Sequence, residues 1–429
     1  MVKIANKMNH KKKLAIVGSG ISGLSTAFHL HEKYDITIFE KENHIGGHTD
    51  THEITVDDQQ LRVDSGFIIF CPEYYPSFTS MLKSLGVESQ ATDMSFAAFN
   101  RQTNVVYNAS SLNKIFCQRR NLFSFKFYRM LFDIVRFYKT SDEVLRSNDI
   151  DTTVEQYLHN KRYSKAFIDD HLLPMISALW SATPQRVKLF PIRHLIEFFK
   201  NHGLMKLIGR PQWLVVKNGS NSYIKALLEQ TQLTWCLGTA VKNIKRENGI
   251  EIITDDNQTH YFDAIVIACH ADQALDMLEQ ATEDEQNILG DIEFEQNHVI
   301  VHSDEHIMHP NRLSWASWNT EVPNDFDSNT QRVCTANYWM NSLQGLVTKT
   351  NIFTSLNTSY KIDPNKIHLE RYYQHPVFTA KSVAAQMKKS KLDGVKNTYY
   401  VGAYWGWGFH EDGARSAKEV SRMIEENLQ

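Results

Sequence analysis

A glycine run near the N-terminus and a later acidic residue form a pattern that fits a bound nucleotide. The run is Gly18-Ser-Gly20-Ile-Ser-Gly23, and Glu40 follows at the distance where an acidic side chain binds ribose hydroxyls. The glycines allow a tight turn, a close approach of backbone to a pyrophosphate, and close packing of helix on strand. The N–H groups and positive dipole end of that helix attract phosphate. The pattern therefore predicts a dinucleotide site.

The segments around this run have the periodicities of a strand, a helix and a second strand. Residues 13–17 are a short apolar, β-branched run, typical of a buried parallel strand. Residues 21–32 place apolar side chains at helical spacing, and 35–39 form a second apolar run that ends at Glu40. A glycine run alone is weak evidence. The evidence for a dinucleotide-binding βαβ unit is strong here, because the glycines are preceded by a strand and followed by a helix, a second strand and an acid at the expected spacing.

A second glycine pair favours FAD over NAD. Gly46 and Gly47 follow Glu40 closely, and such a pair indicates another close approach of backbone to cofactor. Many FAD enzymes of the glutathione-reductase-like superfamily carry this pair. An arginine usually follows it there, whereas this chain has His48. A single G-x-G-x-x-G run argues against a nicotinamide domain, so electrons are expected to leave to oxygen, a quinone or another acceptor.

Two later segments look like further parts of the same domain. Within 213–275, alternating and buried apolar runs predict strands. At the C-terminus, an apolar strand ends at Gly402-Ala403, and a helix is expected from about Ala414 to Asn427 after Gly413. We predict a doubly wound α/β FAD-binding domain with an interleaved α+β substrate domain. The first is expected at 12–74, 211–279 and 393–429, and the second at 75–210 and 280–392.

This three-part layout resembles the flavin-containing amine oxidase superfamily. A closer similarity rests on six motifs spread along the chain, which are Val63-Asp-Ser-Gly-Phe67, Gly209-Arg-Pro-Gln-Trp213, Ser314-Trp-Ala-Ser-Trp-Asn319, Tyr338-Trp-Met-Asn-Ser-Leu-Gln344, His375-Pro-Val-Phe378 and Gly408-Phe-His-Glu-Asp-Gly413. They resemble NAD/FAD-binding proteins found beside cyclopropane-fatty-acid-synthase-like methyltransferases. Some members are implicated as fatty-acyl desaturases in the making of furan fatty acids. The resemblance therefore implies an acyl-lipid substrate and a lipid methyltransferase as a candidate partner.

The motifs and the resemblance together define the expected cofactor site. In flavin oxidases a residue at the place of Val241 presents its backbone to the adenine, and the C-terminal helix points its positive end at the flavin. Monoamine oxidases attach FAD through a cysteine in the C-terminal loop. Residues 402–413 contain none, so we expect non-covalent FAD. The residues predicted to contact it are Gly18, Gly20, Ile21, Ser22, Gly23, Glu40, Lys41, Gly46, Gly47, His48, Thr49, Asp64, Ser65, Gly66, Phe67, Val241, Gly402, Ala403, Gly413 and Ala414.

The C-terminal loop supplies the candidates for chemistry. His410, Glu411 and Asp412 are the polar side chains available for proton transfer near the flavin, which dehydrogenation requires. The alternative is that they cap the following helix, a role that suits Asp412. Aromatic side chains are expected to line the substrate pocket, and these are Tyr338, Trp339, Trp405, Trp407 and Phe409. No metal site is predicted.

Residues 111–140 combine basic and apolar side chains at helical spacing. Arg119, Lys126, Arg129, Asp133 and Arg136 form a charged stripe, and the other faces carry Phe, Leu, Ile and Val. The stripe is either a solvated face of a substrate-domain helix or a surface that docks on an anionic membrane. A lipid-acting enzyme favours the second interpretation.

Composition narrows the class of protein. The chain has 429 residues, of which 42% are hydrophobic and 22% charged, as is ordinary for a globular protein of about two domains. A net charge of −3 gives no global field for nucleic acid. The five cysteines are scattered, and no apolar run could cross a bilayer. We therefore expect a cytoplasmic protein, with docking on the inner face of the membrane as the open alternative.

Together these features predict an FAD-dependent oxidoreductase that dehydrogenates an apolar substrate. A methylated fatty acyl chain, free or in a phospholipid, is favoured. A flavin amine oxidase is the first alternative, with an aromatic cage for a cation at Tyr404, Trp405 and Trp407. The others are a redox-neutral flavin isomerase and a non-catalytic flavoprotein that presents lipid to a methyltransferase.

Overall fold

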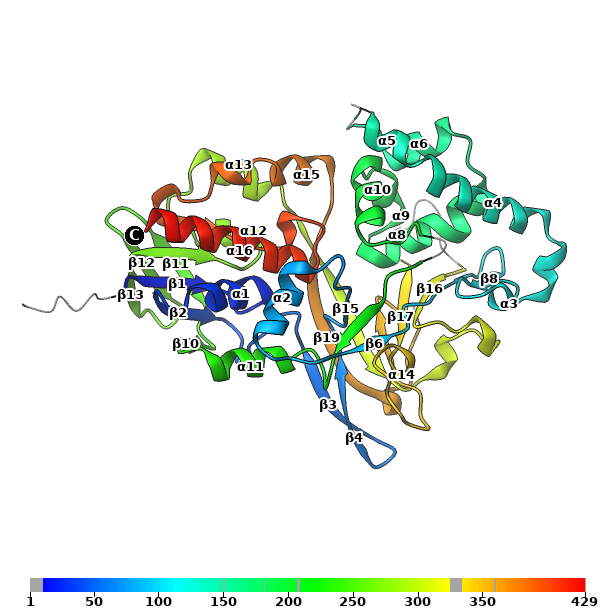
Figure 1. Ribbon diagram of the computed structural model, residues 1–429, viewed down its shortest axis with the longest axis horizontal. Coiled ribbons are helices and arrows are strands. Elements are labelled where there is room, and N and C mark those ends of the chain that lie inside the picture. The colour runs from blue at the N-terminus through cyan, green and yellow to red at the C-terminus, as the bar shows by residue number, and fades with distance from the viewer. Residues whose placement is uncertain are drawn as a thin grey trace, which may run out of the picture.

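Two parts of the molecule lie side by side, each organised around a main sheet (Figure 1). The part at the left of that view carries the C-terminal helix, and the part at the right carries a group of helices above a larger sheet. The structure is a computed structural model that describes residues 11–147, 149, 151–180, 182–206, 209–324, 334–358 and 360–428.

The first part is built on a parallel sheet in the order β10-β2-β1-β14-β20. The strands are β1 (Lys13–Val17), β2 (Asp35–Glu40), β10 (Thr234–Leu237), β14 (Ala264–Ile267) and β20 (Thr398–Tyr400). Alternate side chains of a strand point to opposite faces, so Leu14 and Ile16 pack in one core cluster while Ala15 and Val17 pack in another. Burial on both faces explains the continuous apolar runs in the sequence.

Layers of helix and sheet cover both faces of this sheet. Helices α1 (Ile21–Leu30) and α16 (His410–Asn427) share the core with Leu14 and Ile16. The other face is covered by α12 (Ala271–Met277), α13 (Glu283–Gly290) and a small antiparallel sheet of β11 (Val241–Lys245), β12 (Ile250–Thr254) and β13 (Thr259–Phe262). The arrangement is the doubly wound α/β fold predicted from the glycine motif.

A buried ion pair joins three elements of this part. Arg246, just after β11, donates from Nη2 to Oε2 of Glu285 on α13 at 2.8 Å, and the Tyr400 hydroxyl at the end of β20 donates to the same carboxylate at 2.5 Å. Both partners of the pair are almost fully buried. These donors outweigh burial and lower the pKa of Glu285 to about 2. The pair therefore stays charged in the interior.

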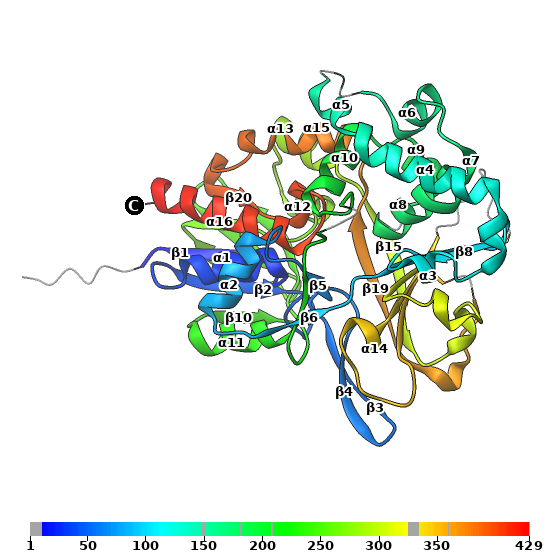
Figure 2. The same ribbon diagram turned by 45° about the vertical axis from the view of Figure 1, so that its right-hand side comes forward.

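The second part is built on a sheet in the order β19-β15-β18-β17-β16-β7-β8. Its longest strands, β15 (Phe294–His302) and β19 (Ile367–Pro376), pair from Phe294 opposite Pro376 to His302 opposite Ile367. Figure 2 shows them running along the boundary between the two parts. The other strands are β7 (Phe96–Asn100), β8 (Val105–Asn108), β16 (Trp318–Val322), β17 (Thr335–Trp339) and β18 (Phe353–Leu356).

Helices cover one face of this larger sheet and form the largest core cluster with it. Phe127, Met130 and Phe137 of α4 are buried in that cluster with Phe96 and Trp318 of the sheet. The helices are α4 (Phe125–Thr140), α5 (Asp142–Arg146), α6 (Val154–Asn160), α7 (Lys165–Phe167), the π-helical turn η2 (Ile168–Leu172), α8 (Leu173–Trp180), α9 (Pro184–Lys188) and α10 (Ile192–Asn201).

Short elements connect the two parts. The hairpin of β3 (Thr51–Val56) and β4 (Gln59–Asp64) packs Ile54 and Val63 against Val301 of the larger sheet. The other short elements of the fold are β5 (Ile69–Phe70), α2 (Pro76–Ser84), β6 (Ser89–Thr92), β9 (Trp213–Val216), α11 (Ser222–Gln230), α14 (Met340–Leu343) and α15 (Ala380–Gln386).

Two local expectations differ from the structure. The C-terminal helix begins at His410 and not near Ala414, because the Asp412 carboxylate accepts hydrogen bonds from the N–H groups of Trp407 and Phe409 and so fixes the helix start there. The stretch 111–140 is three elements: α3 (Leu112–Ile115), a 3₁₀ turn η1 (Arg119–Phe123) and α4. Among the described residues, no helix has both the length and the apolar character needed to span a bilayer.

We predict that Glu285→Gln lowers the free energy of unfolding by about 3–5 kcal/mol, because it leaves the Arg246 charge buried and unpaired. The folded pKa lies near 2 and the ordinary value is 4.5, so the stabilisation is present above pH 4.5 and is lost as the pH falls toward 2. Urea unfolding midpoints across this pH range measure both effects. Glu283→Gln, at an exposed position in the same helix, is the control and leaves the midpoint unchanged.

Candidate functional site

The end of β1 and the start of α1 form a cradle of bare backbone. Gly18 has a φ of +103°, and a Cβ at Gly23 would lie 2.0 Å from the Gly18 carbonyl oxygen, so helix and strand meet only without side chains. A Cβ at Gly20 would meet no protein atom within 4 Å. Gly20 is also the N-cap of α1, and no side chain caps this helix or places an acid in its first turn. The N–H groups at Ile21, Ser22 and Gly23 therefore face a space that suits an anion.

The predicted acid lies at the end of β2 beside this cradle. Oε2 of Glu40 accepts from the N–H and the hydroxyl of Ser19 at 2.9 and 2.7 Å, and Oε1 accepts from the N–H of Glu42 at 3.0 Å. Lys41 next to it is exposed. The carboxylate is thus held at the C-terminal edge of the parallel sheet, where nucleotide ribose binds in doubly wound folds.

The second glycine pair lies against the first. A Cβ at Gly47, whose φ is +57°, would be 3.3 Å from Cα of Gly20. Gly46 has a φ of +130°, and its N–H donates to the Ser19 hydroxyl at 3.3 Å. The two predicted glycine motifs therefore converge. His48 follows, and its Nε2 is shielded from solvent without a hydrogen-bond partner among the described residues.

Asp64 fixes the loop that follows the hairpin. Its carboxylate accepts from Thr51, from the N–H and hydroxyl of Ser220 at the start of α11, and from Nε2 of Gln344 at 2.7 Å. Burial raises the pKa of Asp64 to about 6 against the effect of these donors. The loop Ser65-Gly66-Phe67 is thereby held beside His48, whose carbonyl accepts from the N–H of Phe67 at 2.7 Å.

The C-terminal helix reaches the same place from the other end of the chain. A Cβ at Gly413 would lie 2.7 Å from Oγ of Ser22, so the first turns of α16 and α1 are in contact. The N–H of Gly402 donates to Oγ of Ser416 at 3.1 Å and ties the end of β20 to α16. Ala414 lies in the core cluster beside Ile21. Val241 packs farther along the sheet edge, with Val17 and Phe39.

The three candidates for proton transfer occupy different environments. Glu411 accepts from the N–H groups of Ser77 and Phe78 at 3.0 Å each and so caps α2. Asp412 caps its own helix and contacts Arg415 at 3.2 Å, as the capping alternative anticipates. His410 is stacked on Phe67 at 3.5 Å between ring centroids. The carboxylates are thus engaged with backbone N–H groups. His410 contacts Thr49 through Nε2, and its Nδ1 has no hydrogen-bond partner among the described residues.

His410 belongs to a group of four imidazoles, which we call the imidazole cluster. His410 is buried, and the other three, His48, His270 and His375, are half-buried. The rings of His48 and His375 lie 5.3 Å apart. Burial lowers the pKa of His48 and His270 to about 4 and that of His375 to about 3, and it lowers the pKa of His410 well below its ordinary value. All four rings are therefore neutral at physiological pH. They come from the glycine-rich loop, the loop after β14, strand β19 and α16, so both parts of the molecule contribute.

An aromatic wall leads from this cluster into the helices of the second part. Phe409 stacks on Phe198 at 5.1 Å between centroids, and Trp407 accepts a hydrogen bond on its carbonyl from Nε1 of Trp180 at 3.2 Å. We define the aromatic wall as Trp180, His194, Phe198, His202, Phe378, Trp407 and Phe409. Burial lowers the pKa of both histidines to about 4, so the wall is uncharged.

The five aromatic residues predicted for the pocket do not all come together. Tyr338 packs against the same core cluster as Trp407 and Phe409. Trp339 is next to Tyr338 on a strand and so points to the opposite face, where it contacts Trp315. Trp405 is buried with Tyr404 against the parallel sheet of the first part. The cage of Tyr404, Trp405 and Trp407 expected for a cation does not form as one group.

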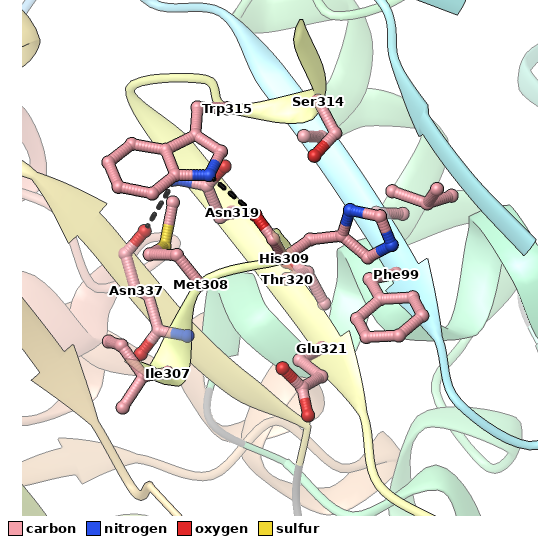
Figure 3. Close-up of a pocket in the computed structure, with 13 residues that line it drawn as sticks. Phe99, Ile307, Met308, His309, Ser314, Trp315, Asn319, Thr320, Glu321 and Asn337 are labelled. Carbon is pink, nitrogen blue, oxygen red and sulfur yellow. Dashed lines mark hydrogen bonds between the residues drawn. The ribbon is translucent and has the colours of Figure 1, made fainter. Parts of the chain in front are cut away.

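A cavity on the opposite face of the larger sheet is too small for a cofactor or an acyl chain. Figure 3 shows Trp315, Asn319 and Phe99 lining it, with the indole N–H of Trp315 donating to the carbonyl of His309 at 2.8 Å. Its volume of about 20 Å³ has room for one water molecule. We take the imidazole cluster and the aromatic wall as the candidate site, because His48 follows the second glycine pair and His410 begins α16.

Comparison with known proteins identifies the family. The chain matches the family described as flavin containing amine oxidoreductase over residues 21–424. The chain belongs to this family. As a member of it, the protein is an FAD-dependent oxidoreductase.

Solved structures share the fold of this amine oxidoreductase family member at low sequence identity. Cyclohexylamine oxidase from Brevibacterium oxydans is 14% identical with a TM-score of 0.71, and the CLA-producing fatty acid isomerase from P. acnes is 14% identical with a TM-score of 0.68. Each comparison covers 97% of this chain and 99% of the other. A carotenoid phi-ring synthase of Chlorobaculum tepidum is 30% identical over 87 residues, which are 20% of this chain and 13% of that relative.

The residues present fit the flavin cofactor that the family implies. A pyrophosphate would occupy the open space at Gly20. It would accept hydrogen bonds from the uncapped start of α1 and from Nε2 of His48, which has no partner among the described residues. Glu40 is placed for a ribose, and the first turn of α16 is placed for the negative end of the flavin ring. The individual contacts predicted from the sequence stay predictions.

Sequence reasoning missed most of the wall and half of the imidazole cluster. His194, Phe198 and His202 recur every four residues, so one helix face carries all three, and this spacing was available as a signal. His375 lies inside a motif that we quoted for the family resemblance without assigning it a role. His270 follows a buried strand at the sheet edge, but nothing in its local sequence distinguishes it from a surface residue.

We predict that Gly20→Ala weakens FAD binding by roughly tenfold or more while the unfolding midpoint of the apoprotein stays unchanged. The new methyl group meets no protein atom, and the φ of −69° suits alanine, so any clash is with the cofactor. Fluorescence titration of apoprotein with FAD measures the affinity.

Gly290→Ala is the matched control for this experiment, because its new Cβ would lie 3.9 Å from Leu275, at ordinary contact distance. Full FAD affinity in Gly20→Ala would show that the pyrophosphate does not approach this glycine.

Proposed function

We propose that this enzyme dehydrogenates an acyl chain, free or in a phospholipid, to form an alkene. The observation that carries the proposal is the uncharged site: neutral imidazoles continue into an aromatic wall, which suits an apolar chain. An ammonium substrate would require a free negative charge or an intact aromatic cage. The acids around the imidazole cluster are engaged: Asp50 with Arg371 at 3.1 Å, Glu411 with backbone N–H groups and Asp412 with Arg415.

The reaction breaks two C–H bonds on neighbouring carbons and forms a C=C bond. One hydrogen leaves with both electrons, and the other leaves as a proton. The bound flavin supplies the two-electron acceptor, held without a covalent bond because the loop 402–413 lacks cysteine. We assign the proton to His410. Its Nε2 is 2.9 Å from Oγ1 of Thr49, which contacts the hydroxyl of Tyr223 at 2.6 Å, so these two residues orient the ring. The electrons then pass to oxygen, a quinone or another acceptor.

The substrate is tested by anaerobic absorbance of the flavin-loaded enzyme. We expect lipid extracts from cells that contain the lipid methyltransferase to bleach the oxidised-flavin band, and extracts from cells without it to leave the band unchanged. Putrescine and cyclohexylamine are the amine probes and should leave it unchanged as well. Bleaching by the amines alone would reject the desaturase and favour an amine oxidase.

Two further outcomes would also reject the proposal. Double-bond migration in the lipid without net flavin reduction would indicate a redox-neutral isomerase. Failure of every substrate, together with tight binding of the methyltransferase, would indicate a non-catalytic flavoprotein partner.

We predict that His410→Asn slows flavin reduction by on the order of 10²- to 10⁴-fold at unchanged flavin content, because the proton acceptor is lost. Stopped-flow absorbance under anaerobic conditions measures the rate. The matched control is His44→Asn, at an exposed position near the glycine pair, which keeps the wild-type rate. A normal rate of flavin reduction in His410→Asn would show that His410 is not the proton acceptor and would point to another member of the imidazole cluster.

A further inference from the structure

A patch of large apolar side chains is exposed between α3 and α4. Phe123 is 92% exposed, Phe125 85% and Leu112 76%, and we define the docking patch as Leu112, Leu122, Phe123, Phe125, Tyr128 and Phe132. Single exposed apolar residues are ordinary on protein surfaces, whereas a group of them marks an interaction site. Phe125, Tyr128 and Phe132 recur at helical spacing on α4 and so share one face. Leu122 and Phe123 belong to the apolar face expected from the sequence, whereas Phe127, Met130 and Phe137 of that face are buried in the core.

The turn that carries the most exposed residues is held in place. Ser124 lies between Phe123 and Phe125, and its hydroxyl accepts from the N–H of Phe127 at 3.3 Å as the N-cap of α4. Buried side chains one turn later anchor the helix to the core. The two phenylalanine rings are therefore held outward by the packing of α4.

Five basic residues lie in the same segment as the docking patch, and four of them form no ion pair with any described residue. The fifth, Arg129, pairs with the buried Asp133 at 3.2 Å. Residues 111–132 include Lys114, Arg119, Arg120, Lys126 and Arg129 and contain no Asp or Glu. Arg119 donates to the carbonyl of Phe116 at 3.0 Å, and Arg120 donates to the carbonyl of Asn104, so both keep their charge uncompensated. Lys114 and Lys126 form no ion pair with any described residue.

Position in the fold leaves the patch accessible. Figure 1 shows α3 and the start of α4 at the far right of the molecule, at the opposite end from the C-terminus. The helices behind α4 belong to the aromatic-wall side of the larger sheet.

We propose that residues 112–132 dock on the surface of an anionic lipid bilayer. Phe123 and Phe125 enter the boundary between headgroups and acyl chains, and the surrounding cations lie against lipid phosphates. Apolar insertion and attraction to anionic lipid act together at such surfaces, whereas either one alone binds weakly. The absence of acids in the segment favours a lipid surface over an oppositely charged protein that would need a matched pattern. The inference does not depend on which substrate reduces the flavin.

Vesicle sedimentation with the full flavin-loaded chain tests the apolar contribution. We expect binding to vesicles of phosphatidylglycerol and phosphatidylcholine, and a loss of roughly tenfold or more in Phe123→Ser/Phe125→Ser. The matched control is Tyr261→Ser/Val347→Ser, which removes two apolar side chains that are 66% and 86% exposed elsewhere, and it keeps wild-type binding. Equal losses in both double variants would overturn the proposal, as would failure of the wild type to bind.

The charge contribution has its own test. Lys114→Gln/Lys126→Gln is expected to reduce binding by roughly tenfold or more at low salt, because each cation near an anionic surface adds to the attraction. Lys225→Gln/Lys242→Gln, at exposed positions in the first part, is the control. Equal binding to vesicles of phosphatidylcholine alone would contradict the proposal. So would a dimer in light scattering that Phe123→Ser/Phe125→Ser dissociates, because a second copy would then be the occupant.

Discussion

The contact between the first turns of α1 and α16 determines the rest of the site. Gly413 permits it, since any side chain there would collide with Ser22. Two helices that begin at one point direct two positive dipole ends into the same space. Glu411 and Asp412 lie in the first turn of α16 and offset part of its dipole, whereas the first turn of α1 holds no acid. An anionic ligand is the remaining way to balance the field, which gives a physical reason for a pyrophosphate and an electron-rich ring at this junction.

Buried titratable groups are charged in one region of the molecule and neutral in another. Ionised groups are kept where they join elements, as with Arg246 and Glu285 under the parallel sheet, and each has donors that compensate for burial. Around the candidate site the opposite holds, because burial keeps the imidazoles of His48, His375 and His410 neutral. Burial thus has two outcomes. Under the parallel sheet, Arg246 and Glu285 stay charged because they pair with each other, and at the candidate site the unpaired imidazoles stay neutral, which suits a substrate without charge.

Local motifs could be predicted from the sequence because their function is local. The glycines at 18, 20 and 23 act within one strand-turn-helix unit, and Glu40 follows on the next strand, so spacing alone placed them. The aromatic wall could not be placed in this way, because Trp180, Phe198, Phe378 and Phe409 come from separate segments whose meeting depends on tertiary packing. Tyr338 and Trp339 show the intermediate case. Both lie in a recognisable strand, and its alternation sends one to the helices and the other to the opposite face.

The continuous pairing of β15 with β19 has a mechanical consequence. This two-stranded ribbon runs along the boundary between the two parts, and His375 near its end belongs to the imidazole cluster. The ladder hydrogen bonds join two strands of the larger sheet and stiffen this edge of it, with one register shift between Val301 and His302. A stiff sheet edge holds His375 in a constant position relative to the other strands of the second part.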